Sequence, residues 1–113
     1  MQRIFIEKMA EYVGKSVTVA GWIETKRNHG KVIFLDIKDS TGKVQSVVVS
    51  SQSFFDQAVQ VKEQSAVIVS GKIVKRPERM ITAGFNGDIE LQISDLIIKN
   101  EAKDFNSLPH SLF

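Results

Sequence analysis

Phe34 is the side chain in this sequence best suited to bind a flat aromatic ligand. It alternates with Asp36 and Lys38 along residues 31–39, and the opposite face of that run is aliphatic. An aromatic ring on the outer face of a sheet can stack on a nucleic-acid base, a contact worth ~1 to 3 kcal/mol whichever base it is. The alternative is that Phe34 packs beneath a loop or helix as ordinary core.

Two clusters of positive charge flank the region of Phe34. The first contains Lys26, Arg27 and Lys31, with His29 at its turn and no acidic residue. The second follows a later strand into a loop and comprises Lys72, Lys75, Arg76 and Arg79. A single such cluster is usual for solvated surface, but two clusters that border one face of a sheet would act together. There they would attract nucleic-acid phosphates.

Two further side chains could recognise the edge of a base. The Gln45 amide offers a donor and an acceptor together. Asp88 and Glu90 are expected to face outward on the last strand. Because a carboxylate repels phosphate, a functional Glu90 would accept from a base amino group or reject the wrong base. Each of these side chains also fits an ordinary exposed strand surface.

Catalytic, metal and membrane functions find no support in the sequence. There is no cysteine, and His29 and His110 lack ligand spacing. No phosphate-binding glycine loop, nucleophile motif or acidic metal cluster occurs. The 113 residues are 42% hydrophobic and 25% charged with a net charge of +2, which is typical of one globular domain. No apolar run approaches the ~20 residues that span a bilayer, so we expect a cytoplasmic protein without a cofactor.

The elements that position these side chains are predicted to be five strands and one helix. Alternation with a period of two predicts strands over residues 15–27, 31–39, 43–50, 65–76 and 88–98. Helical spacing predicts a short helix within residues 51–64, with Ser51 or Ser53 as its cap. This order is that of the OB-fold, an all-β five-stranded Greek-key barrel with a helix between strands three and four.

Two further expectations concern the course of the chain. Gly21 interrupts the first strand and predicts a bulge or sharp bend that helps the sheet to close. Residues 1–98 are expected to form the OB domain, since the amino terminus has no apolar signal core. Residues 99–113 lack periodicity and contain Pro109, so they are expected to be a tail or an interdomain linker.

Several short motifs occur in a fixed order along nearly the whole chain. They are Gly21-Trp22-Ile23, Lys26-Arg27-Asn28-His29-Gly30-Lys31, Phe34-Leu35-Asp36-Ile37-Lys38-Asp39, Val44-Gln45, Arg76-Pro77 and Gly87-Asp88-Ile89-Glu90-Leu91. Together they resemble the anticodon-binding OB domain of class IIb aminoacyl-tRNA synthetases. The resemblance is strongest to the aspartyl type, with the asparaginyl type next. One departure is Phe85-Asn86 before Gly87, where that family more usually has a Thr-Gly pair.

The resemblance implies a role for each of four residues in binding a tRNA anticodon stem-loop. Phe34 would stack on the middle anticodon base, a uridine, and Gln45 would read the edge of that base. Arg27 would hold the loop backbone, and Glu90 would contact a neighbouring anticodon position.

The chain lacks the synthetase catalytic motifs Phe-Arg-x-Glu and Gly-x-Gly-x-Gly-x-Arg, so alone it is not expected to activate an amino acid. The resemblance implies an excised domain of an aspartate–tRNA ligase, a homodimer that would use ATP and Mg. Two alternatives stay open. One is a freestanding OB protein that binds single-stranded RNA or DNA without sequence preference, and the other is an OB module that docks a protein.

Overall fold

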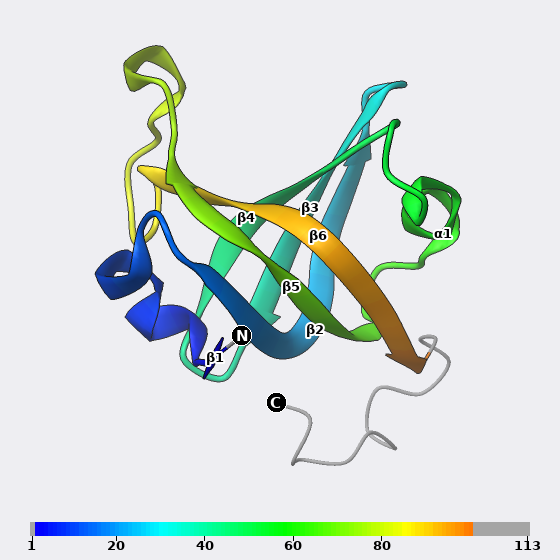
Figure 1. The fold of residues 1–113 in the computed structure, drawn as a ribbon, viewed down its shortest axis with the longest axis horizontal. Helices are drawn as coiled ribbons and strands as arrows, with labels where there is room; N and C mark the ends of the chain where they lie inside the picture. The colour runs from blue at the N-terminus through cyan, green and yellow to red at the C-terminus, as the bar shows by residue number, and fades with distance from the viewer. Residues whose placement is uncertain (1, 101–113) are drawn as a thin grey trace.

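Five strands close into a barrel in the computed structural model, which describes residues 2–100 (Figure 1). They hydrogen-bond in the order β2-β3-β4-β6-β5, and β5 pairs back onto β2. All pairings are antiparallel except β4 with β6. The strands are β2 (Ser16–Asn28), β3 (Val32–Asp39), β4 (Gly42–Val49), β5 (Ala66–Lys75) and β6 (Ile89–Asn100). This topology confirms the predicted OB-fold, and β1 (Gln2–Arg3) adds a short parallel strand beside β2.

The core fills the inside of the barrel because each strand alternates as its sequence predicts. Ile33, Leu35 and Ile37 on β3 are fully buried, and so is Leu91 on β6. The intervening residues of β3 and β4 face outward, where they are partly or fully exposed. Burial of such an aliphatic side chain contributes ~1.5 to 3 kcal/mol.

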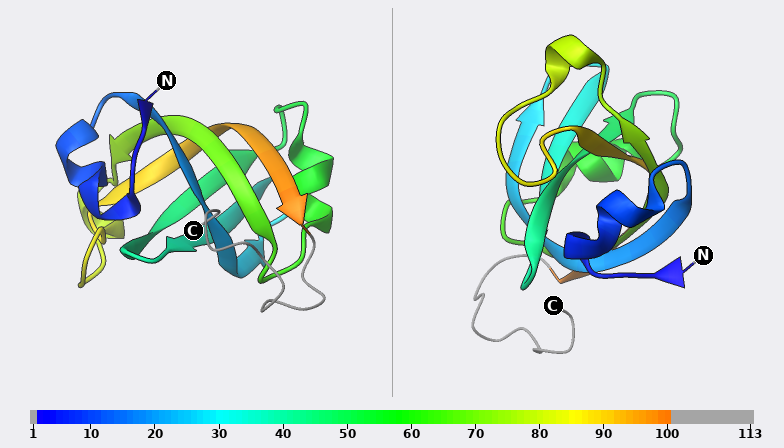
Figure 2. Two further views of the ribbon diagram at one scale, coloured as in Figure 1. Left: turned by 90° about the horizontal axis from the view of Figure 1, so that it is seen from below. Right: turned by 90° about the vertical axis from the view of Figure 1, so that its left-hand side faces the viewer.

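Two short helices lie at opposite ends of the barrel (Figure 2). The 3-10 helix η1 (Ile6–Tyr12) buries Ile6 and Met9, which pack in the hydrophobic core. The helix α1 (Phe55–Gln60) follows β4 and precedes β5 in the chain, and it packs Ala58 into the core. It lies within the range of 51–64 where one short helix was predicted. Phe54 occupies the cap position without a side-chain hydrogen bond, so the serine cap prediction is wrong.

The bulge in β2 lies three residues beyond Gly21. The register with β3 shifts between Ile23 and Thr25, so that Glu24 is the extra residue. Gly21 instead allows a close approach between strands, because a Cβ there would lie 2.2 Å from the Lys38 carbonyl oxygen. The predicted bulge therefore exists but is not at the glycine.

The strand boundaries lie within two residues of the prediction. β6 continues to Asn100, past the predicted limit of residue 98. The predicted tail beyond residue 100 lies outside the described residues. The loop between β5 and β6 contains a short 3-10 helix, η2 (Glu78–Met80). Among residues 2–100 no helix combines the length and apolar character needed to cross a membrane.

Candidate nucleic-acid interface

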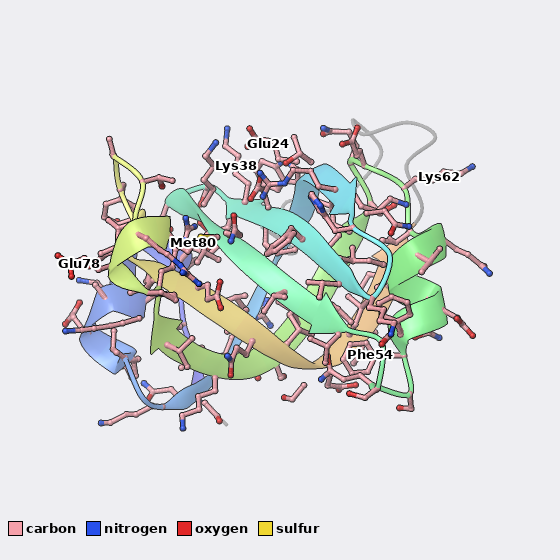
Figure 3. The ribbon with its side chains drawn as sticks, turned by 90° about the horizontal axis from the view of Figure 1, so that it is seen from above. Glu24, Lys38, Phe54, Lys62, Glu78 and Met80 are labelled. Atoms are coloured by element: carbon pink, nitrogen blue, oxygen red, sulfur yellow. The ribbon has the colours of Figure 1, made fainter. Side chains whose placement is uncertain are left out.

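The outer surface of β3 and β4 lies between two projecting segments (Figure 3). The η2 loop, where Glu78 and Met80 are labelled, stands at one end. The β2–β3 hairpin and α1 stand at the other, near Phe54. This is the arrangement predicted for a face that a single strand of nucleic acid could cross.

Arg27 joins three strands across this surface. Its Nη2 donates to Gln45 Oε1 on β4 at 3.0 Å, and it lies 3.4 Å from Asp36 Oδ1 on β3. The guanidinium carbon also lies 5.6 Å from the centre of the Phe34 ring. The Arg27 side chain is 48% exposed, so its ion pair contributes little to folding stability. Its main structural effect is to hold these neighbours in a fixed arrangement.

The Phe34 ring lies outside the barrel core, as the alternation predicts. Phe34 is half-buried between Arg27 and Val47, its partners on the adjacent strands. The His29 ring meets it edge-to-face, with centroids 5.4 Å apart and planes at 84°. Arg27 and His29 thus border a partly exposed aromatic surface.

The contact with Arg27 fixes how the Gln45 amide is oriented. A guanidinium has donors but no acceptor. The amide oxygen of Gln45 must therefore face Arg27, which leaves its NH₂ group to donate elsewhere. Asp36 is similarly engaged, because it also accepts a hydrogen bond from the Thr25 hydroxyl.

A groove of about 260 Å³ runs from these residues to the η2 loop. We call it the Arg27 groove. Its charged lining residues are three cations and one carboxylate, and that carboxylate is already paired with Arg27. The groove is therefore positively charged. The residues that line it are Arg27, Asp36, Lys43, Val44, Gln45, Arg76, Thr82, Ala83, Phe85, Asn86 and Gly87.

Arg76 both lines the groove and holds the η2 loop in place. Its Nε donates to the Ile89 carbonyl oxygen at 3.0 Å. Its Nη1 lies 3.5 Å from the Met80 carbonyl oxygen and 3.4 Å from Thr82 Oγ1. A change at Arg76 would thus alter the shape of the groove as well as its charge.

Glu90 lies beside Gln45. β4 and β6 pair in parallel with Ser46 opposite Leu91, both of which are buried. The preceding residues, Gln45 and Glu90, therefore face outward on adjacent strands. Glu90 is half-buried, and within residues 2–100 its carboxylate has no hydrogen-bond or ion-pair partner.

The remaining predicted cations are spread more widely than the sequence suggests. Lys31 is exposed at the hairpin tip, and Arg79 is exposed in η2 beside Pro77 and Glu78. Lys72 and Lys75 are exposed on β5, which β6 separates from β4. These two lysines do not line the Arg27 groove.

Lys26 points away from this surface. Its Nζ donates to the carbonyl oxygens of Val59 at 2.7 Å and Val61 at 2.8 Å, at the end of α1. Its backbone N–H donates to Glu63. Because a cation in this position satisfies free helix carbonyls, Lys26 stabilises the hairpin–helix contact. We leave it out of the interface.

Eight of the eleven residues that line the groove were not among the predicted site residues, and Lys43, Thr82 and Phe85 are three of them. The sequence signal for Phe85 is an aromatic ring in the loop segment Gly84-Phe85-Asn86-Gly87. In the part of the chain that the structure describes, no cluster of three or more His, Cys, Asp or Glu side chains could hold a metal ion.

Comparison with known proteins gives a consistent family. The family described as OB-fold nucleic acid binding domain matches residues 17–98. An aspartate–tRNA(Asp/Asn) ligase from Prochlorococcus marinus (strain AS9601) is 36% identical over 100 residues, which are 86% of this chain and 16% of the ligase. The same ligase from Corynebacterium diphtheriae is 39% identical over 93 residues, 81% of this chain and 15% of its own length.

The solved structures agree with this comparison. The asparaginyl-tRNA synthetase from Pyrococcus horikoshii, complexed with asparaginyl-adenylate, has a TM-score of 0.76 and 32% identity. The match covers 97% of this chain and 25% of the synthetase. The chain therefore belongs to the OB-fold nucleic acid binding domain family, as an anticodon-binding domain of the aspartyl- and asparaginyl-tRNA synthetase type.

Proposed function

We propose that this chain binds the anticodon stem-loop of tRNA for a cytoplasmic aspartate–tRNA ligase. In this proposal the central uridine of the anticodon stacks on Phe34, and Gln45 recognises its edge. Membership of the family supports anticodon binding. The observation that carries the finer proposal is that Arg27 contacts both Phe34 and Gln45.

Recognition of uridine would follow from the orientation of the Gln45 amide. Its NH₂ group can donate to the O4 acceptor of uracil. Cytosine carries an amino donor at that position, so two donors would face each other. An unpaired or mismatched polar group at a desolvated contact costs ~1 to 3 kcal/mol.

The charges around the groove would hold the RNA backbone. Arg27, Lys43 and Arg76 line the groove, while Lys31 is exposed at the tip of the β2–β3 hairpin and Arg79 is exposed in η2. Glu90 would accept a hydrogen bond from the base next to the central one, because it lies beside Gln45 and has no partner in residues 2–100. An acidic group there would also disfavour bases that present only acceptors.

Aminoacylation would belong to a longer protein. The curated relatives are ligases of which this chain matches 16%. In such a ligase, which we propose to be a homodimer, ATP and Mg would be used outside these residues. We expect no ATP-dependent charging of tRNA by residues 1–113 alone, because the synthetase motifs are absent from them.

Titration against six RNA stem-loops tests the proposal. The loops carry the anticodons for aspartate, asparagine and lysine, each with central uridine or with cytidine in its place, at one salt concentration. We expect the tightest binding to the aspartate loop and weaker binding of all three cytidine variants. Equal affinity for all six loops would indicate binding without sequence preference. No RNA binding at all would favour a protein-docking module.

A further inference from the structure

Phe85 is the most exposed large apolar side chain in residues 2–100, at 62%. The other exposed large apolar residues are Phe5, Val49, Met80, Ile81 and Ile97. None of those five lines the Arg27 groove, whereas Phe85 does. Phe85 also borders a second hollow, beside Glu24 and Lys38. An aromatic ring exposed at the edge of a positively charged groove has a surface that a planar ligand could cover.

Hydrogen bonds hold the turn that carries Phe85. Thr82 N–H donates to the Gly87 carbonyl oxygen at 3.0 Å, and Gly87 N–H donates to that of Gly84 at 3.2 Å. Asn86, which follows Phe85 in the sequence, is 8% exposed, and its Nδ2 donates to the Lys43 carbonyl oxygen at 3.0 Å. The turn is therefore fastened to β4, although 43 residues separate the two in sequence.

The ring lies against the first residue of β4, which is a glycine. A Cβ built at Gly42 would lie 3.3 Å from Phe85 Cε2 and 3.5 Å from Cδ2. A side chain at this position would crowd the ring. A ring carried by a hydrogen-bonded turn loses less conformational freedom when a ligand covers it than a ring on a mobile loop would, and this makes binding more favourable.

We propose that Phe85 is a second stacking platform, which binds an unpaired base next to the base on Phe34. The inference rests on the proposed function, since it concerns another base of the same RNA. Arg27 lies against Phe34 and also lines the groove that Phe85 borders. A strand whose central base lies on Phe34 can therefore pass Arg27 and reach Phe85. Asn86 positions the platform through its bond to β4.

The first measurement compares the affinity of three variants for the aspartate stem-loop. Loss of a stacked base weakens binding by roughly 5- to 150-fold. We expect Phe85→Ala to weaken it by about tenfold. Phe85→Trp should retain most of the affinity. Met80→Ala is the matched control, because Met80 is 52% exposed in the same loop but does not line the groove, and it should bind as wild type does.

The second measurement identifies the base. Each position of the anticodon loop is replaced in turn by an abasic nucleotide, and the affinity is measured with wild type, Phe34→Ala and Phe85→Ala. Where a base stacks on a side chain, its removal should make the alanine substitution harmless, so that the two effects are not additive. We expect Phe34 to couple to the central position and Phe85 to an adjacent one.

The outcomes separate this inference from the proposed function. If Phe34→Ala weakens binding while Phe85→Ala does not, the second platform is wrong and the proposed function stands. If Phe85→Ala weakens binding but couples to no single base, Phe85 acts without stacking and the inference is also wrong. If wild type binds no stem-loop, both fail.

Discussion

The guanidinium of Arg27 donates to the amide oxygen of Gln45 at 3.0 Å, although 18 residues separate the two. Because a guanidinium has no acceptor, the Gln45 amide presents its oxygen to Arg27. Its NH₂ group is then the end that faces a ligand. The same guanidinium lies against Phe34. The proposed stacking surface and the proposed base-reading group are therefore held by one side chain.

Phe34→Ala should weaken binding of every anticodon stem-loop by ~1 to 3 kcal/mol, because stacking does not depend on base identity. The fold should stay intact, since Phe34 lies outside the buried core. Binding titrations and circular dichroism check both statements. Phe5→Ala is the control, being 56% exposed and away from the groove, and should leave affinity unchanged. An unfolded Phe34→Ala protein would show that the ring belongs to the core.

Gln45→Ala should reduce affinity for the cognate loop less than Phe34→Ala does, but should shrink the preference for uridine over cytidine at the centre. The reason is that the lost amide group discriminates between base edges. Gln45→Glu is a sharper variant, because a carboxylate can still accept from Arg27 but has no donor. In titrations against the uridine and cytidine loops, both variants should show a smaller preference for uridine over cytidine than the wild type does. An undiminished preference in both would assign base reading to another residue.

Lys31 should contribute to the affinity for RNA, whereas Lys26 should contribute to the stability of the fold. Affinity should fall as salt rises, and Lys31→Gln should make the logarithmic slope shallower by about 0.7 if Lys31 neutralises one phosphate. Lys26→Gln should instead lower the free energy of unfolding by ~1 to 3 kcal/mol, since it removes two charged hydrogen bonds to α1 carbonyls. Salt titrations and urea unfolding of both variants measure this. A flat salt response of the wild type would contradict the electrostatic role.

Asp39→Ala should destabilise the fold by roughly 3 kcal/mol, because it leaves one buried and several partly buried donors without an acceptor. Asp39 is 1% exposed. Its Oδ2 accepts from Ile6 N–H at the start of η1, and its Oδ1 accepts from Thr41 and Gly42 in the β3–β4 turn. Urea unfolding measures the loss. Asp95→Ala, at an exposed position on β6, is the control and should change stability by less than ~0.5 kcal/mol.

The sequence by itself determined the barrel and much of the face. Side chains alternate with a period of two along a strand, so the placement of Phe34 outside the core follows from its aliphatic neighbours Ile33 and Leu35. The order of three strands, a helix and two strands likewise predicts the OB topology. The short helix α1 was predicted, but its serine cap was not found: Phe54 occupies the cap position, and the other end of the helix is held by a distant residue, Lys26.

Only the tertiary structure decided which side of the hairpin faces the proposed RNA-binding surface. The bulge at Glu24 inserts one residue between Ile23 and Thr25, and an inserted residue exchanges the two faces of the strand beyond it. Arg27 is thereby placed outward beside Gln45, and its sequence neighbour Lys26 is directed toward α1. Phe85 likewise joins the groove through the bond of Asn86 to β4. No local pattern records these contacts, because they depend on how strands distant in sequence are packed.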